Sequence, residues 1–108
     1  MLIAQSWTAD HDAELDEASV RAAFQPAERY RISLYRYPTG TRFGGTMIAG
    51  MCIVLRGQCT FSFEQSVRLR AGEFAELPGG SYQLVADGDI DLELVLAWEL
   101  PPVDQPSL

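Results

Sequence analysis

The sequence contains no lysine and no asparagine, and its 108 residues include only one histidine, His11, and two cysteines, Cys52 and Cys59. The lack of lysine excludes enzymes that form a Schiff base through a lysine amine. A single histidine excludes any site within one chain that needs two imidazoles. The spacing of the two cysteines fits neither a CxxC redox motif nor a zinc-binding pattern, and two cysteines are too few for a disulfide scaffold. We therefore expect reduced thiols in a cytoplasmic protein.

Long apolar runs and an excess of positive charge are also missing. No apolar run approaches the roughly 20 residues of a membrane-spanning helix, and the first residues, MLIAQSW, lack the basic and apolar regions of a secretory signal. The formal net charge is −7, with 15 acidic against 8 basic residues. Since such a protein presents no positive field to phosphates, we expect neither nucleic acid nor membrane as a partner.

The first part of the chain, residues 1–28, is an acidic arm. Asp16 stands before residues that suit a helix, and acidic side chains are favourable at a helix start. We predict that Asp16 caps a short helix over residues 17–25, which Pro26 ends. His11 lies in this arm, and we interpret it as a solvated side chain rather than a cation ligand.

From residue 29 onward, hydrophobicity alternates with a period of two, which is typical of β-strands. The alternation begins with Tyr30, Ile32 and Leu34 among polar neighbours. It is clearest in residues 90–100, where six apolar side chains fall on one face. This last pattern predicts an antiparallel strand that is buried on one face and solvated on the other.

Glycine and proline interrupt the alternation roughly every 6–12 residues, which divides it into about seven or eight short strands. Residues 44–45, Gly-Gly, are one predicted break, and residues 78–80, Pro-Gly-Gly, are the strongest turn signal. We therefore predict an all-β antiparallel sandwich or barrel over residues 29–100. Residues 101–108, after two prolines, are expected to form a loose tail.

The segment from about residue 30 to 98 resembles the cupin superfamily of small jelly-roll β-barrels. The second cupin motif reads Gly, five residues, Pro, one residue, Gly, two residues, His. Here Gly72, Pro78 and Gly80 match, and Gln83 takes the place of the histidine. The resemblance implies a small antiparallel jelly-roll barrel, which the acidic arm and its short helix precede.

The first cupin motif is matched only in its scaffold. Residues 37–41 resemble its opening and residues 54–57 its close, and counting back from Gly57 puts Gly50 where the family has a glutamate. Residues 43–48, where two histidines would stand, contain none. Because a cupin metal site needs imidazoles and a carboxylate, we expect no metal and no cofactor.

The candidate site follows from the same alignment. Gln83 and Gly50 should face the barrel interior, and Cys52 lies on the strand face of Gly50. The candidate ligand pocket consists of Gly50, Cys52, Glu76, Tyr82 and Gln83. Two interpretations of Gln83 remain open, a hydrogen bond to a ligand or to backbone and water in a filled barrel. Cys52 has no histidine base nearby, which favours an inert buried thiol over a nucleophile.

These observations favour a metal-free cupin-like protein that binds or senses a small, partly apolar molecule. Glycine in place of glutamate at position 50 should enlarge the interior. A cupin-type enzyme, isomerase or dioxygenase-like, with an atypical site at Glu76, Tyr82 or Cys52 is the alternative. A structural module with a filled barrel is a further one. The sequence does not decide whether the protein is an enzyme.

We also expect a homodimer. A small jelly roll exposes strand edges that invite pairing, and the small cupins that this chain resembles are often dimers. Leu2, Ile3 and Trp7 are apolar residues in an acidic arm, and such residues favour burial. We therefore predict that this part of the arm crosses to a partner subunit.

Overall fold

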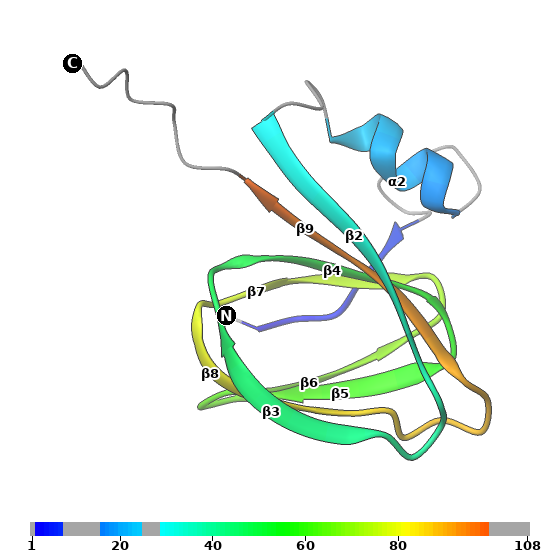
Figure 1. The fold of residues 1–108 in the computed structure, drawn as a ribbon, viewed down its shortest axis with the longest axis vertical. Helices are drawn as coiled ribbons and strands as arrows, with labels where there is room; N and C mark the ends of the chain where they lie inside the picture. The colour runs from blue at the N-terminus through cyan, green and yellow to red at the C-terminus, as the bar shows by residue number, and fades with distance from the viewer. Residues whose placement is uncertain (1, 8–15, 25–28, 100–108) are drawn as a thin grey trace.

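The structure, a computed structural model, describes residues 2–7, 16–24 and 29–99 (Figure 1). In chain order the elements are β1 (Gln5–Ser6), α2 (Glu17–Ala23), β2 (Tyr30–Tyr37), β3 (Arg42–Met47), β4 (Gly50–Arg56), β5 (Gln58–Ser62), β6 (Ser66–Arg70), β7 (Glu73–Leu77), β8 (Gly80–Val85) and β9 (Leu92–Glu99). The predicted all-β fold with a short N-terminal helix is confirmed. The predicted tail over residues 101–108 and His11 lie outside the described residues.

The strands form two facing antiparallel sheets. One sheet has five strands in the order β1-β7-β4-β9-β2, and the other has four in the order β3-β8-β5-β6. Apart from the β5–β6 hairpin, each connection from β2 to β9 leads from one sheet to the other (Figure 1). This alternation between sheets is the topology of a jelly roll.

Two glycines that were expected to interrupt the chain lie within a strand instead. Gly44 and Gly45 belong to β3 and pair with Gln83 and Tyr82 of β8. The prediction of a break there was wrong, because pairing along the whole of β3 holds both glycines in extended conformation. The chain leaves β3 only after Met47, and β4 begins at Gly50.

The main hydrophobic core lies between the two sheets. Its fully buried members include Cys52, Val54, Cys59, Leu69 and Leu92. They come from both sheets, and their side chains alternate along each strand with exposed ones, most regularly in β6. Hydrophobic burial between the sheets therefore stabilises the barrel.

A second buried cluster lies on the outer face of the five-stranded sheet. It consists of Trp7, Val20, Ile53, Phe74 and Val95. Val95 is 0% exposed although it points away from the barrel interior. The prediction that the last strand is solvated on one face was therefore wrong for its central part, because the N-terminal segment covers that face.

The helix of this segment begins as predicted. The side chain of Asp16 accepts a hydrogen bond of 2.7 Å from the backbone N–H of Ser19, and the Ser19 hydroxyl receives one of 2.9 Å from the N–H of Asp16. These reciprocal bonds form a capping box, which satisfies donors that a helix start leaves unpaired. The helix places Val20 in the outer cluster, where it is 0% exposed.

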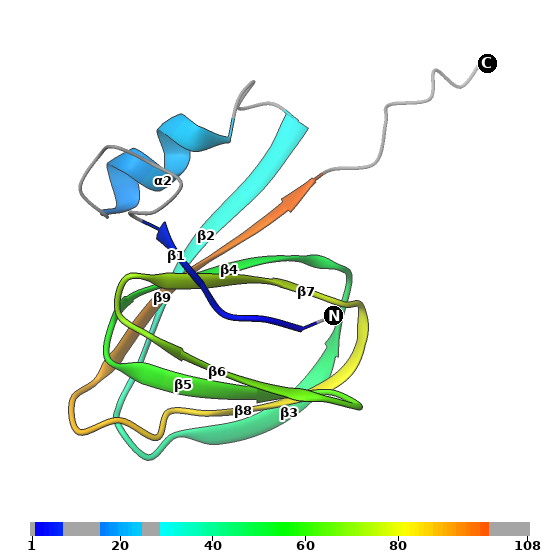
Figure 2. The ribbon, with the colours of Figure 1, turned by 180° about the vertical axis from the view of Figure 1, so that it is seen from behind.

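Trp7 packs against its own chain. Strand β1 pairs with the edge of β7 (Figure 2), and the N–H of Trp7 donates to the carbonyl of Gly72 at 2.8 Å. The indole meets Phe74 edge to face at 5.7 Å between ring centroids and is 1% exposed. Trp7 is thus buried within a single chain, whereas Ile3 is 51% exposed. In the described part of the chain, no helix is long and apolar enough to span a membrane.

Candidate functional site

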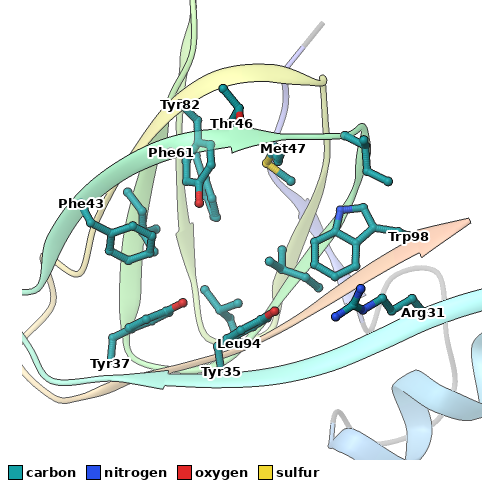
Figure 3. A pocket seen from close by; sticks show the side chains of 13 residues that line it. Arg31, Tyr35, Tyr37, Phe43, Thr46, Met47, Phe61, Tyr82, Leu94 and Trp98 are labelled. Carbon is teal, nitrogen blue, oxygen red and sulfur yellow. The ribbon is translucent and has the colours of Figure 1, made fainter.

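A cavity of about 380 Å³ lies between the two sheets (Figure 3). Its walls are Arg31, Tyr35 and Tyr37 of β2, Phe43, Thr46 and Met47 of β3, Ile48, Phe61 of β5, Tyr82 and Leu84 of β8, and Leu94, Leu96 and Trp98 of β9. The volume lies in the range of roughly 300–1,000 Å³ that is usual for small-molecule sites. Part of the barrel interior is therefore open rather than packed.

The alternation of side chains along β9 and β2 determines which of them face this cavity. On β9, Leu94, Leu96 and Trp98 follow one another at every second position and face inward. On β2, Arg31 pairs directly with Trp98, and Tyr35 pairs with Leu94. Antiparallel pairing thus brings a cation next to an indole and a phenol next to an aliphatic side chain.

Aromatic rings surround the centre of the cavity. Tyr35 and Tyr37 are stacked, with centroids 6.1 Å apart and planes at 5°. Tyr37 lies 5.1 Å from Phe43, and Phe43 lies 6.3 Å from Tyr82, which also contacts Phe61 at 6.0 Å. In Figure 3 the tyrosines of β2 form one side of the space, and Tyr82 extends toward them from the other.

Three phenol hydroxyls belong to this ring of side chains, those of Tyr35, Tyr37 and Tyr82. Burial raises the pKa of Tyr37 above its ordinary value, and the neighbouring Tyr35 and Tyr82 raise it further. At neutral pH the Tyr37 hydroxyl is therefore protonated and able to donate a hydrogen bond. The cavity combines flat apolar walls with a small number of polar groups.

Trp98 closes one end of the cavity together with Arg31 (Figure 3). The indole Nε1 is buried and has no hydrogen-bond partner among the described residues. The guanidinium carbon of Arg31 lies 5.9 Å from the centroid of the indole ring, which is a cation–π geometry. Among the described residues that line the cavity, Arg31 is the only charged one.

Gly50 does not add space to the cavity. A Cβ atom at this position would lie 2.5 Å from Cδ1 of Trp98 and 2.9 Å from its Nε1. The indole therefore fills the room beside Gly50. The expectation that glycine enlarges the interior here was wrong.

Gln83 lies on the exposed face of β8. Its strand neighbours Tyr82 and Leu84 line the cavity. Because side chains alternate along a strand, Gln83 must point away from the space that they face. The expectation that Gln83 points into the barrel was wrong, and Tyr82, predicted on the turn beside it, is the residue that faces the interior.

The other predicted site residues lie elsewhere. Cys52 is fully buried in the core between the sheets, and Glu76 is exposed on β7. Glu76 borders a separate surface groove of about 800 Å³, together with Leu2 and Phe63. The structure thus brings one predicted residue, Tyr82, to the cavity, and sets Gly50 directly behind its wall.

Both cysteines are free and buried. Burial raises the pKa of Cys59 to about 12, and nearby Asp87 adds to this. Burial likewise raises the pKa of Cys52, with a smaller contribution from Cys59. Since the thiolate is the nucleophile, neither side chain has the electrostatic environment of a catalytic cysteine.

The two-sheet arrangement is similar to that of several solved structures. A protein from Neisseria meningitidis matches with a TM-score of 0.60 and 16% identity over 82% of this chain and 100% of that chain. A cupin 2 domain-containing protein from Halorhodospira halophila has a TM-score of 0.59 and 17% identity, covering 73% of this chain and 57% of its own. A cupin 2 conserved barrel domain protein from Salinispora arenicola has a TM-score of 0.57 and 20% identity, covering 67% and 64%.

The chain has the cupin fold. At these identities the likeness shows the architecture and carries over no activity. No family model matches the sequence, and no curated protein matches it.

The donor set of this cupin barrel does not suit a metal ion. Among the residues that the structure describes, no group of three or more His, Cys, Asp or Glu side chains is placed to hold one. The described residues of the cavity wall offer phenols, an indole, the Thr46 hydroxyl, a thioether and hydrocarbon, and their one charge is the cation of Arg31. Hard and borderline metal ions prefer carboxylates or imidazoles, so the lining residues do not fit a metal.

The candidate site predicted from the sequence did not include the most informative residues of this cupin barrel, namely Arg31, Tyr35, Tyr37 and Trp98. The apolar alternation of β2 draws attention to Ile32 and Leu34, yet these pack against the outer cluster. The opposite face of β2 lines the cavity. Aromatic side chains at both 35 and 37 were the available signal, since a solvated strand face seldom carries two in succession.

Proposed function

We propose that this protein binds a small organic molecule in the cavity between its two sheets. The observation that carries the proposal is the ring of Tyr35, Tyr37, Phe43 and Tyr82 around an open space. Aromatic walls offer a ligand a large contact area, and the phenol hydroxyls provide a few polar groups to orient it. A binding or sensing role follows more directly from this arrangement than a structural role, which would be served by a filled barrel.

A catalytic function has less support than binding. Of the residues that the structure describes, those that line the cavity include no carboxylate, imidazole or thiol. General acid–base catalysis at neutral pH relies mostly on such groups, and an activated nucleophile needs a base beside it. Of the residues considered for an atypical enzyme, Glu76 and Cys52 do not line the cavity. Tyr82 does line it, but the described wall residues include no carboxylate or imidazole that could act as a base beside it.

The proposal can be tested with a neutral fluorophore, N-phenylnaphthylamine, and two matched variants. Leu96→Phe adds a ring on the cavity wall, whereas Leu34→Phe makes the same change beside the outer cluster. We expect saturable binding and a raised melting temperature for the parent protein. Leu96→Phe should abolish binding and Leu34→Phe should retain it.

Equal binding by both variants, with both folded by circular dichroism, would place the site elsewhere. Because overpacking can cost about 1–3 kcal/mol, each melting temperature must be measured without the probe. If Leu96→Phe does not fold, Tyr82→Leu and Leu84→Phe provide further changes in the same wall. Failure of the parent protein to bind the probe would favour the filled-barrel alternative.

We also propose that the protein is a cytoplasmic homodimer. Edge strands such as β2 and β3 are available for pairing between subunits, and Ile48 is 63% exposed beside β3. The free thiols are consistent with a reducing compartment. Light scattering at micromolar concentration tests the assembly, and the mass of a single chain would contradict it.

A further inference from the structure

We infer that the ligand is a small organic anion, a carboxylate carried on a flat apolar body, with the carboxylate at Arg31. This inference rests on the proposed function of the cavity and narrows the class of molecule that it binds. It follows from the sign of the charge at the site, from a guanidinium that has no carboxylate partner among the described residues, and from the shape of the walls.

The charge in the cavity wall is opposite in sign to the net charge of the protein. The protein has a formal net charge of −7, yet the one charged side chain that lines the cavity in the described part of the chain is the cation of Arg31. The walls therefore attract an anion and repel a cation, whereas the protein as a whole has the opposite preference. Aromatic rings can also attract a cation, but a cation in this cavity would meet the like charge of Arg31.

The guanidinium of Arg31 has no carboxylate partner among the described residues. Arg36 of the same strand is engaged with Glu93 at 2.8 Å, and Arg21 with Glu17 at 2.9 Å. Arg31 is instead positioned by the indole of Trp98, at 5.9 Å from its centroid. Its fork of N–H donors remains available, and this fork matches the two oxygens of a carboxylate.

The position of Arg31 at one end of the cavity gives the charged group and the apolar body of such a ligand different places. Figure 3 shows Arg31 beside Trp98 at one end of the cavity, with the tyrosines and Phe43 toward the other. A carboxylate at the Arg31 end keeps its charge near solvent, since Arg31 is exposed. The body of the ligand then extends among the rings, where a flat group fits between the stacked Tyr35–Tyr37 pair and Tyr82.

Other ligand classes fit these walls less well. A sugar would need many hydrogen-bonding groups on all sides, whereas the walls consist mainly of aromatic and aliphatic side chains. A long fatty acid has a flexible chain, which makes less use of flat aromatic walls than a planar body does. A compact aromatic or otherwise flat carboxylate satisfies the charge, the size and the wall chemistry together.

The experiment compares carboxylates with their neutral amides. Benzoate and benzamide have nearly the same shape, as do indoleacetate and indoleacetamide. We expect the carboxylate of at least one pair to bind the parent protein roughly two- to fivefold more tightly than its amide, the difference that an ion pair near solvent provides. Isothermal titration calorimetry gives both affinities, and benzylamine serves as the cationic comparison.

Three variants locate the effect. Arg31→Gln should abolish the preference for the carboxylate, and Arg31→Lys should keep only part of it because lysine lacks the planar fork. Arg42→Gln changes the net charge by the same amount at an exposed position of β3 outside the cavity wall, and it should leave the preference intact. Melting temperatures of all three variants confirm that they fold.

Each result decides a separate claim. Amides that bind as tightly as carboxylates, or an unchanged preference in Arg31→Gln, would overturn the anion inference and leave the cavity as a site for neutral molecules. If no carboxylate binds but N-phenylnaphthylamine does, the inference also fails and the proposed function stands. If neither the carboxylates nor the fluorophore binds, both are wrong.

Discussion

Gly50 and Trp98 occupy neighbouring strands in a way that allows no side chain at position 50. A Cβ atom there would lie 2.5 Å from Cδ1 of the indole and 2.9 Å from the carbonyl oxygen of Ala97. The indole in turn forms one end of the cavity, and the guanidinium of Arg31 lies over its ring in a cation–π contact. The glycine therefore matters to the site through the position of the tryptophan.

Gly50→Ala should therefore destabilise the protein by about 1–3 kcal/mol, the usual effect of overpacking. Chemical denaturation monitored by circular dichroism measures this loss. Gly45→Ala is the matched control, because a Cβ there would lie 3.6 Å from Tyr82, an ordinary contact. An equal loss of stability in the two variants would contradict the proposed fit between Gly50 and Trp98.

Replacing the indole provides a second test of the same pair. Trp98→Leu should reduce the destabilisation that Gly50→Ala causes, because part of the clash partner is gone. The coupling energy from the double-mutant cycle should be about 0.5 kcal/mol or more, as for other residues in contact. Additive effects would show that the two positions do not constrain each other.

Trp7 should contribute to the stability of its own chain. Trp7→Ala removes the largest buried side chain of the outer cluster, and such truncations cost about 3–5 kcal/mol. Ile3→Ala, at a position that is 51% exposed, should change stability by less than about 0.5 kcal/mol. The loss for Trp7→Ala should not depend on protein concentration, whereas a role in subunit contact would make it do so.

The two buried thiols predict a loss of stability at alkaline pH. Burial raises the pKa of Cys59 to about 12 and also raises that of Cys52. In the unfolded chain, the pKa of a thiol is about 8.5. As the pH rises above this value, the unfolded chain loses protons that the folded chain keeps. The free energy of unfolding should therefore fall by about 1.4 kcal/mol per pH unit for each thiol.

Denaturation in a reducing buffer between about pH 8 and 10 measures this slope, below the range where Tyr37 adds its own contribution. The double variant Cys52→Ala, Cys59→Ala should be less stable at every pH, because it leaves cavities, but its profile should be flatter. If the free energy of unfolding of the parent protein depends on pH as little as that of the variant, burial does not keep the thiols protonated.

The sequence allowed the jelly roll to be predicted because its main determinants are local. Alternating hydrophobicity identifies the strands, and Gly72, Pro78 and Gly80 mark turns that the structure contains. The capping residue Asp16 was predictable for the same reason, since its hydrogen bond reaches only to Ser19. Burial of Val95 on the outer face was not, because it depends on a long-range contact with the N-terminal segment.

The candidate site was predicted less well because a motif alignment does not determine which way a side chain points. Gln83 occupies the aligned position of a ligand, yet strand alternation turns it outward and turns Tyr82 inward. The cavity end formed by Arg31 and Trp98 joins residues far apart in the sequence. Only the pairing of β2 with β9 brings them together.

Fluorine NMR of protein labelled with fluorotryptophan tests the central claim, that a ligand enters the barrel, most directly. The two tryptophans give two resonances, which Trp7→Phe assigns; Trp98 lines the cavity and Trp7 lies on the opposite face of the sheet. We predict that benzoate or benzamide shifts the Trp98 resonance saturably and leaves that of Trp7 in place. Binding of these molecules that moves only the Trp7 resonance, or saturating amounts that move neither, would contradict a ligand site inside the barrel.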